Sequence, residues 1–201
     1  MGSIRITGIV GSPRKNKNSD TLVQKVLDGC QNQGALIDKI YLQDIEISPC
    51  KAHKTQDGKG CVVHDGMDQI YKVFEDTDGL ILGTPVYYNS VSAQMKLMID
   101  RSYCLARAES IGPGKRRYVT NVVKRKKGVV ISVGGSGTNP DCVLPIFDIW
   151  STEVNLEIID TLCVSEGQLG MLPMESKTIL EKAFQQGENL MRQLTGADSF
   201  K

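Results

Sequence analysis

The sequence predicts an α/β fold of the doubly wound class, in which helices cover both faces of a five-stranded parallel sheet. Apolar runs of strand length alternate along the chain with segments whose apolar residues recur at helical spacing. Some of these runs are continuous, which is typical of parallel strands buried on both faces. Glycine or proline ends several of them, as expected at the edge of a sheet. We therefore expect three layers: helix, sheet and helix.

The elements follow one another in a regular order. The first strand is expected at residues 4–10 and ends at Gly11-Ser12-Pro13. A polar loop follows, and then a helix with an apolar stripe at Leu22, Val23, Val26, Leu27 and Cys30. Further strands are expected at 36–42, 79–83, 129–133 and 156–164, and further helices at 67–76, 90–107, 141–154 and 176–194. We expect a single domain over residues 1–201, with a long polar loop at about 43–66.

Charge and composition exclude several classes of function. The 201 residues have a formal net charge of +1, which argues against general binding of nucleic acid or of acidic surfaces. No apolar run reaches membrane-spanning length and no apolar signal segment precedes the first strand, so we expect a cytoplasmic protein. Six cysteines in such a chain favour free thiols over a disulfide framework.

The loop between the first strand and the first helix has the composition of an anion site. Backbone N–H groups and the helix dipole are expected to converge there. Arg14 can donate a bidentate pair of hydrogen bonds, and the side chains of Ser12, Asn18 and Ser19 can donate to phosphate oxygens. A phosphate monoester is the ligand that these groups suit. The alternative is a surface turn in which Asn18 or Ser19 caps the helix.

Two other loops should end at the same edge of the sheet as this one. Residues 84–89 read T-P-V-Y-Y-N, in which a fixed proline and two tyrosines can border a planar heterocycle. Residues 134–137 are rich in glycine, which lets the backbone approach a ring closely. Each loop alone is equally well interpreted as an ordinary strand end. Together they predict a site for a phosphate joined to an aromatic ring.

At these three segments the chain resembles the NADPH-dependent FMN reductase family, and in particular its iron-sulfur flavoprotein branch. The matching stretches are G-S-P-R-K-N-K-N-S at 11–19, G-T-P-V-Y-Y-N-S-V-S-A-Q-M-K-L-M-I-D-R at 83–101 and S-V-G-G-S-G at 132–137. The resemblance implies a flavodoxin-like sheet of strand order 2-1-3-4-5 and bound FMN. It implies these cofactor-binding residues: Ser12, Arg14, Asn16, Asn18, Ser19, Thr21, Pro85, Val86, Tyr87, Tyr88, Asn89, Gly134 and Gly135.

The resemblance also draws attention to the loop at 43–66, where the branch has four clustered cysteines. Only the outer two, Cys50 and Cys61, are present here, and His53 and Gln56 stand in place of the inner two. An iron-sulfur cluster needs thiolates at nearly every corner, so it is not favoured. Zinc held by Cys50, His53, Cys61 and His64 is a second alternative, with unusual spacing. We favour a polar loop with two thiols that are free or paired as a disulfide.

The expected function is that of an FMN-dependent oxidoreductase. Hydride would pass from NAD(P)H to FMN and then to a quinone, a flavin, a nitro or azo compound, or a redox protein. No side chain needs to act as catalytic acid or nucleophile. The alternative is an FMN protein, with or without an iron-sulfur or zinc centre, that transfers electrons without using NAD(P)H efficiently.

Two surfaces bear on possible partners. The helix at 90–107 carries methionines and could form the interface of a homodimer or homotetramer. The basic stretch at 115–127 is interpreted as a solvated loop or hairpin balanced by acidic residues, and alternatively as a site for the 2′-phosphate of NADPH or an anionic partner.

Overall fold

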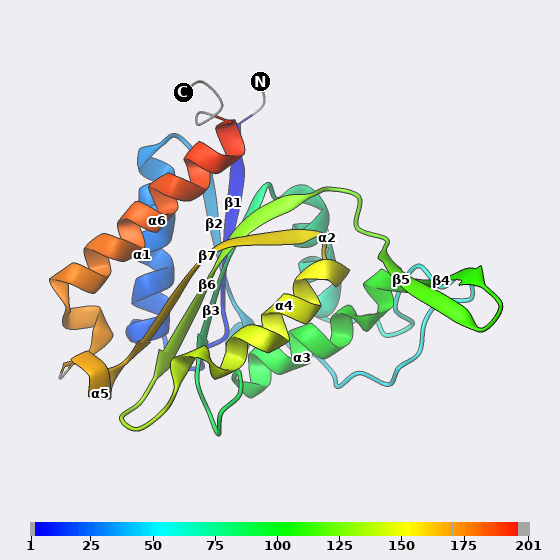
Figure 1. The fold of residues 1–201 in the computed structure, drawn as a ribbon, viewed down its shortest axis with the longest axis horizontal. Helices are drawn as coiled ribbons and strands as arrows, with labels where there is room; N and C mark the ends of the chain where they lie inside the picture. The colour runs from blue at the N-terminus through cyan, green and yellow to red at the C-terminus, as the bar shows by residue number, and fades with distance from the viewer. Residues whose placement is uncertain (1–2, 170, 197–201) are drawn as a thin grey trace.

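Five parallel strands form the central sheet of the computed structural model, which describes residues 3–169 and 171–196 (Figure 1). The strands are β1 (Arg5–Val10), β2 (Leu36–Tyr41), β3 (Gly79–Pro85), β6 (Lys126–Gly134) and β7 (Leu156–Ser165), in the order β2-β1-β3-β6-β7. Because β6 and β7 are the fourth and fifth strands of this sheet, the predicted order 2-1-3-4-5 is confirmed. Residues 1–2 and 197–201, at the ends of the expected single domain, lie outside the described residues.

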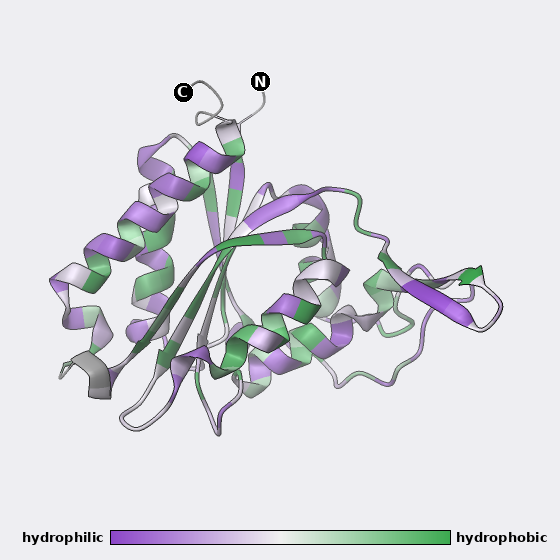
Figure 2. Cartoon of the chain, in the orientation of Figure 1, coloured by the Kyte–Doolittle hydropathy of each residue, from purple (hydrophilic) through white to green (hydrophobic). Residues whose placement is uncertain are grey.

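Helices cover both faces of the sheet. One face carries α1 (Asn18–Asn32) and α6 (Lys177–Thr195), and the other carries α2 (Met67–Asp76), α3 (Ala93–Arg101) and α4 (Leu144–Glu153). Short helical segments are η1 (Leu42–Asp44), η2 (Ser102–Leu105), η3 (Pro140–Val143), α5 (Glu166–Leu169) and η4 (Pro173–Glu175). Figure 2 shows hydrophobic residues along the central strands and mixed faces on the covering helices, as burial of one helix face requires.

Each face of the sheet has its own apolar core. Between the sheet and α2, α3 and α4, Trp150 packs edge-on against Phe74, with ring centroids 5.7 Å apart. On the other face α1 and α6 approach so closely that a Cβ atom on Gly29 would lie 2.1 Å from the carbonyl oxygen of Phe184. Only glycine allows this contact.

The prediction of one helix over residues 90–107 is wrong in its second half. Ser92 caps α3 by accepting a hydrogen bond from the N–H of Met95, at 3.2 Å. The helix ends at Arg101, and the chain continues as a 3₁₀ turn and then as strand β4 (Ala106–Gly112). Met95 and Met98 are fully buried in the core. These methionines therefore cannot supply a surface for a second subunit.

Strand β4 pairs with β5 (Lys115–Thr120) as an antiparallel hairpin that extends away from the sheet (Figure 1). The hairpin contains Lys115, Arg116 and Arg117, the first three basic residues of the stretch at 115–127. This arrangement fits the interpretation of a solvated hairpin balanced by acidic residues. Glu109 accepts hydrogen bonds from Arg107 at 2.7 Å and from Arg117 at 3.0 Å, so part of the positive charge is balanced within the hairpin. Among the described residues, no helix is both long enough and apolar enough to cross a membrane.

Candidate functional site

The three loops singled out from the sequence meet at the carboxyl edge of the sheet. The N–H of Gly11 donates to the carbonyl of Gly83 at 2.7 Å, and the N–H of Val86 donates to the carbonyl of Val133 at 2.8 Å. The hydroxyl of Ser92 donates to the carbonyl of Gly11 at 2.6 Å. Backbone atoms of β1, β3 and β6 therefore hold the loops against one another.

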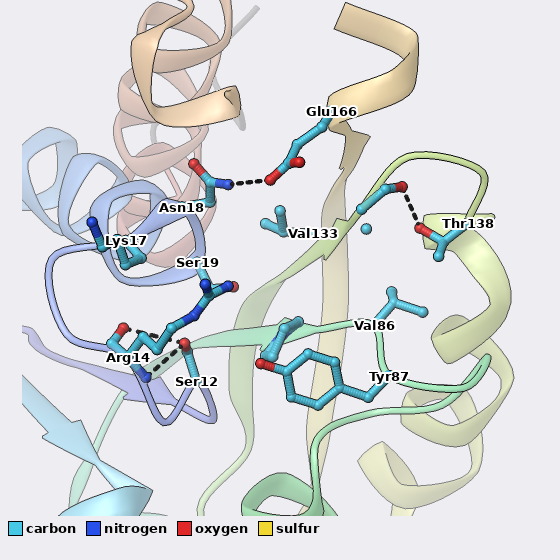
Figure 3. Close-up of a pocket in the computed structure, with 13 residues that line it drawn as sticks. Ser12, Arg14, Lys17, Asn18, Ser19, Val86, Tyr87, Val133, Thr138 and Glu166 are labelled. Carbon is cyan, nitrogen blue, oxygen red and sulfur yellow. Dashed lines mark hydrogen bonds between the residues drawn. The ribbon is translucent and has the colours of Figure 1, made fainter. Parts of the chain in front are cut away.

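The loops enclose a cavity of about 380 Å³ (Figure 3). This volume lies within the range of small-molecule and cofactor sites. In Figure 3, Ser12, Arg14, Lys17 and Ser19 gather on one side of the cavity, and Val86, Tyr87 and Thr138 lie on the other. The complete lining is Ser12, Arg14, Lys17, Asn18, Ser19, Pro85, Val86, Tyr87, Val133, Gly134, Gly135, Thr138 and Glu166.

The cationic side of the cavity lies at the N-terminus of α1. The N-cap residue is Lys17, and within the described part of the chain no side chain caps the helix. The alternative of a turn capped by Asn18 or Ser19 is therefore wrong. The first N–H groups of α1 need another acceptor, and Arg14 and Lys17 add positive charge beside them. This end of the cavity is suited to an anion with several oxygens.

Asn18 has a structural part in this arrangement. Its amide nitrogen donates to Glu166 at 3.2 Å, and its amide oxygen accepts a hydrogen bond from the N–H of Met174 at 3.2 Å. It thereby joins the start of α1 to the segments that follow β7. Ser12 forms a local turn, since its hydroxyl accepts a hydrogen bond from the N–H of Arg14 at 3.2 Å.

The loop after β3 forms a tight two-residue turn. Tyr87 and Ser90 exchange backbone hydrogen bonds of 2.9 and 3.0 Å. Tyr88 and Asn89 both have left-handed backbone angles, with φ of 50° and 57°. Such a conformation is strained for tyrosine. The turn directs Tyr87 into the cavity and leaves Tyr88 completely exposed.

Nine of the thirteen residues expected to bind the cofactor line the cavity. Asn16, Thr21, Tyr88 and Asn89 do not line it. Asn16 instead donates its N–H to the buried carboxylate of Asp20, at 2.7 Å. The lining residues that were not expected are Lys17, Val133, Thr138 and Glu166. Val133 is the last residue of one predicted strand, and Glu166 follows another. Their positions at strand ends could have identified them from the sequence.

The glycines after β6 leave room for a flat ligand. A Cβ atom on Gly135 would meet no described atom within 4 Å, so this backbone borders open space. A Cβ atom on Gly134 would collide with the hydroxyl of Thr138 at 2.0 Å. A helix end suited to an anion, an apolar wall with an aromatic ring and an open glycine backbone are together the features that FMN would need.

The loop at 43–66 does not gather its four candidate metal ligands. The sulfur of Cys50 accepts a hydrogen bond from the N–H of Ala52 at 3.3 Å, and His53 is exposed. His64 is also exposed and lies 3.2 Å from Asp68. The described residues contain no group of three or more histidine, cysteine or acidic side chains placed to hold a metal ion. The donor set does not fit an iron-sulfur cluster.

A buried ion pair holds this loop instead. The guanidinium of Arg101 is fully buried, lies 2.6 Å from the carboxylate of Asp65, and donates to the carbonyls of Ser48 and Val63 at 3.0 Å each. Burial alone would raise the pKa of Asp65. Hydrogen bonds from Arg101 and from the N–H groups of Ser48 and Met67 outweigh it and lower that pKa to about 2.

Comparison with known proteins shows the family to which the chain belongs. A family model described as NADPH-dependent FMN reductase matches residues 4–144. The chain is 36% identical over 134 residues to an iron-sulfur flavoprotein of Methanosarcina thermophila, covering 66% of this chain and 64% of that protein. It is 40% identical over 101 residues to an iron-sulfur flavoprotein of Methanocaldococcus jannaschii, covering 49% of this chain and 52% of that protein.

Solved structures support the fold. A flavone reductase superposes with a TM-score of 0.70 over 98% of this chain and 65% of its own length, at 19% sequence identity. The first two relatives are matched over about half to two thirds of their length, so the similarity defines the family rather than the whole activity. On the family match and the shared fold, this chain belongs to the NADPH-dependent FMN reductase family, a family of FMN-dependent oxidoreductases, and resembles its iron-sulfur flavoproteins.

Proposed function

We propose that this chain binds FMN in the cavity at the carboxyl edge of the sheet and transfers electrons from NAD(P)H to an acceptor. The observation that carries the proposal is the pairing, within one cavity, of an uncapped helix N-terminus flanked by two cations with an open glycine backbone facing Tyr87. The acceptor would be a quinone, a free flavin, a nitro or azo compound, or a redox protein.

The chain's own residues would bind and orient the cofactor. Arg14, Lys17 and the first N–H groups of α1 would neutralise its phosphate. Pro85, Val86 and Tyr87 would border the ring system and exclude water from one edge, and the N–H groups near Gly135 would face its polar rim. FMN, when bound, supplies the hydride and electron chemistry. No acidic, basic or nucleophilic side chain is required for the transfer itself.

The proposal can be tested by loading the full chain with FMN. We expect stoichiometric binding, measured by quenching of flavin fluorescence, and oxidation of NADPH or NADH that depends on a soluble quinone. Comparison of the two nucleotides under the same conditions would show which one the protein prefers. A chain that takes up no FMN would contradict the site, and a loaded chain that oxidises neither nucleotide would contradict the reaction.

Electron transfer without efficient use of NAD(P)H is a second candidate, favoured by the similarity to proteins named iron-sulfur flavoproteins. The two candidates differ in how the loaded protein is reduced. In stopped flow, the first requires rapid bleaching of the flavin absorbance by NADPH or NADH. The second requires slow bleaching by both nucleotides but rapid reduction by a one-electron donor such as a reduced viologen.

We also propose that a second copy of this chain completes the cavity, in a homodimer or homotetramer. Support comes from Tyr88, whose ring is completely exposed beside the cavity and held there by a strained turn. An aromatic ring in this position would lose its exposure to water in an interface. Light scattering of the FMN-loaded chain should give a mass of at least two copies, and the mass of one copy would contradict the proposal.

A further inference from the structure

Asp20 is a buried carboxylate in the first turn of α1 that the proposed electron transfer does not use. Its side chain is only 2% exposed, and it does not line the cavity. A buried carboxylate is costly unless it is paired and hydrogen-bonded, so its partners must account for its presence. One carboxylate oxygen accepts a hydrogen bond from the N–H of Asn16 at 2.7 Å. Because Asn16 belongs to the loop between β1 and α1, Asp20 ties this loop to the helix that follows it.

This hydrogen bond helps to fix the shape of the loop. Asn16 has a left-handed backbone, with φ of 57°. An acid at the third position of a helix usually reaches back to the N–H of the N-cap residue. Here the N-cap residue is Lys17, and the carboxylate of Asp20 reaches one residue further, to Asn16. Asp20 thereby orders the loop without occupying the N–H groups of the first helical turn, which an anion needs.

The negative charge of Asp20 is balanced from the neighbouring edge strand β2. The ammonium group of Lys39 lies 2.8 Å from one carboxylate oxygen of Asp20. The hydroxyl of Tyr41 donates to the same oxygen at 3.1 Å. Burial alone would lower the pKa of Lys39, but the hydrogen bond to Asp20 outweighs burial and raises that pKa. Lys39 is therefore held as a cation beside Asp20.

Without this balance, Asp20 would oppose the binding of a phosphate. The phosphate of FMN carries about two negative charges at neutral pH. Asp20 directly follows Ser19, which lines the anion side of the cavity. Like charges close to one another repel, and they do so more strongly where water is excluded. Lys39 offsets this repulsion although it does not line the cavity itself.

We propose that Asp20 and Lys39 are positioning residues of the anion site. Asp20 fixes the loop in a shape that receives the phosphate, and Lys39 keeps the charge of Asp20 from weakening its binding. A loop that is ordered before the ligand arrives loses less entropy on binding. The inference rests on the proposed function, because it takes the phosphate of FMN as the ligand. It gives β2, which supplies none of the lining residues named above, a part in binding the cofactor.

The test compares the affinities of the full chain for FMN and riboflavin, which lacks only the phosphate. Lys39→Met leaves the charge of Asp20 unbalanced, so FMN binding should weaken about 10-fold while riboflavin binding changes by less than about twofold. The matched control is Lys25→Met. Lys25 is also paired with an aspartate, Asp28, at 2.9 Å, and it does not line the cavity. This control should leave both affinities unchanged in a fluorescence titration.

Two double variants separate the role of the charge from the role of the hydrogen bond. Lys39→Met with Asp20→Asn removes the unbalanced charge and keeps an oxygen for the N–H of Asn16. Its FMN affinity should return to within about threefold of that of the unmodified chain. Lys39→Met with Asp20→Ala removes both the charge and the acceptor, so FMN should bind about 10-fold more weakly than in the asparagine version.

The possible results distinguish the inference from the function on which it rests. An unchanged FMN affinity in Lys39→Met, or equal weakening of FMN and riboflavin, would overturn the charge-balancing role of Lys39. Equal FMN affinities in the asparagine and alanine double variants would overturn the positioning of the loop by Asp20. If the unmodified chain bound FMN no more tightly than riboflavin, the phosphate site of the proposed function would itself be wrong, and the inference would fall with it.

Discussion

The cavity and the loop at 43–66 both concentrate residues capable of chemistry, but only the cavity brings its candidates together. Strand ends position the cavity loops, and backbone hydrogen bonds of 2.7 and 2.8 Å tie those loops to β3 and β6. The loop at 43–66 contains a single β-bridge, between Lys54 and Cys61, and its backbone hydrogen bonds are mostly local ones within the loop. The side chain of Arg101 connects it to α3. Residue types close in sequence therefore indicate a site more reliably when sheet topology fixes where they lie.

The largest expected effect comes from removing the side chain that holds the loop. Arg101→Met leaves the carboxylate of Asp65 without its cation in a largely buried position, and breaking such a pair costs about 3–5 kcal/mol in the free energy of unfolding. Urea unfolding measures this change. The matched control is Arg107→Met, because the ion pair of Arg107 with Glu109 is exposed and should contribute roughly 0–1 kcal/mol.

A double variant sharpens this prediction. Arg101→Met combined with Asp65→Leu removes both charges, so most of the lost stability should return. A cost for Arg101→Met that is no larger than that of the exposed control would mean that this residue does not hold the loop.

Substitutions in the cavity should have the opposite effect to those at Arg101: they should weaken FMN binding and leave the free energy of unfolding nearly unchanged. Arg14→Ala removes a charge-assisted hydrogen bond to phosphate worth about 1.5–3 kcal/mol, which corresponds to roughly 10–100-fold weaker FMN binding. Because Arg14 is exposed, the free energy of unfolding without FMN should change by less than about 0.5 kcal/mol. Fluorescence titration measures the affinity.

Arg116→Ala on the hairpin is the control for a general effect of positive charge. It removes an exposed arginine that does not line the cavity, so FMN affinity should stay the same. Equal weakening by both variants would indicate long-range electrostatics in place of a phosphate contact.

Acid should loosen the loop through Asp65. The pKa of this carboxyl is about 2 in the folded chain and 3.8 at its ordinary value. A lowered pKa stabilises the fold above pH 4, and this contribution, on the order of 2 kcal/mol, disappears as the pH falls from about 4 to 2. Unfolding free energies of Asp65→Asn should therefore fall less steeply over this range. An identical pH dependence in the two proteins would contradict the assigned pKa.

The sequence predicted the sheet well because local and long-range signals agree there. Short continuous apolar runs bounded by glycine, such as 79–83, are typical of central strands, and the crossover rules leave few orders for five of them. The helix expected at 90–107 fails because its apolar spacing continues past Arg101. Pairing of Ala106–Gly112 with Lys115–Thr120 overrides that local signal.

The site was predicted less completely for two physical reasons. Tyr88 was expected to bind the cofactor from its position in the loop, but two left-handed residues in succession turn its side chain out. No periodicity reveals such a turn. Glu166 reaches Asn18 across 148 positions of sequence, and only the folded sheet brings them together.

The smallest expected effect concerns the two histidines, and it tests whether the loop is a metal site at all. The side chain of His64 is 79% exposed, and its only polar partner among the described residues is Asp68, one helical turn away. Replacing both His53 and His64 with glutamine should change the free energy of unfolding by no more than about 0.5 kcal/mol, since exposed pairs of this kind contribute little. Zinc content per chain, measured by elemental analysis, should be the same before and after the replacement. Loss of one bound zinc on replacement would contradict this prediction. It would mean that the loop is a metal site that forms only when the ion binds, whereas the cavity is already formed without a ligand.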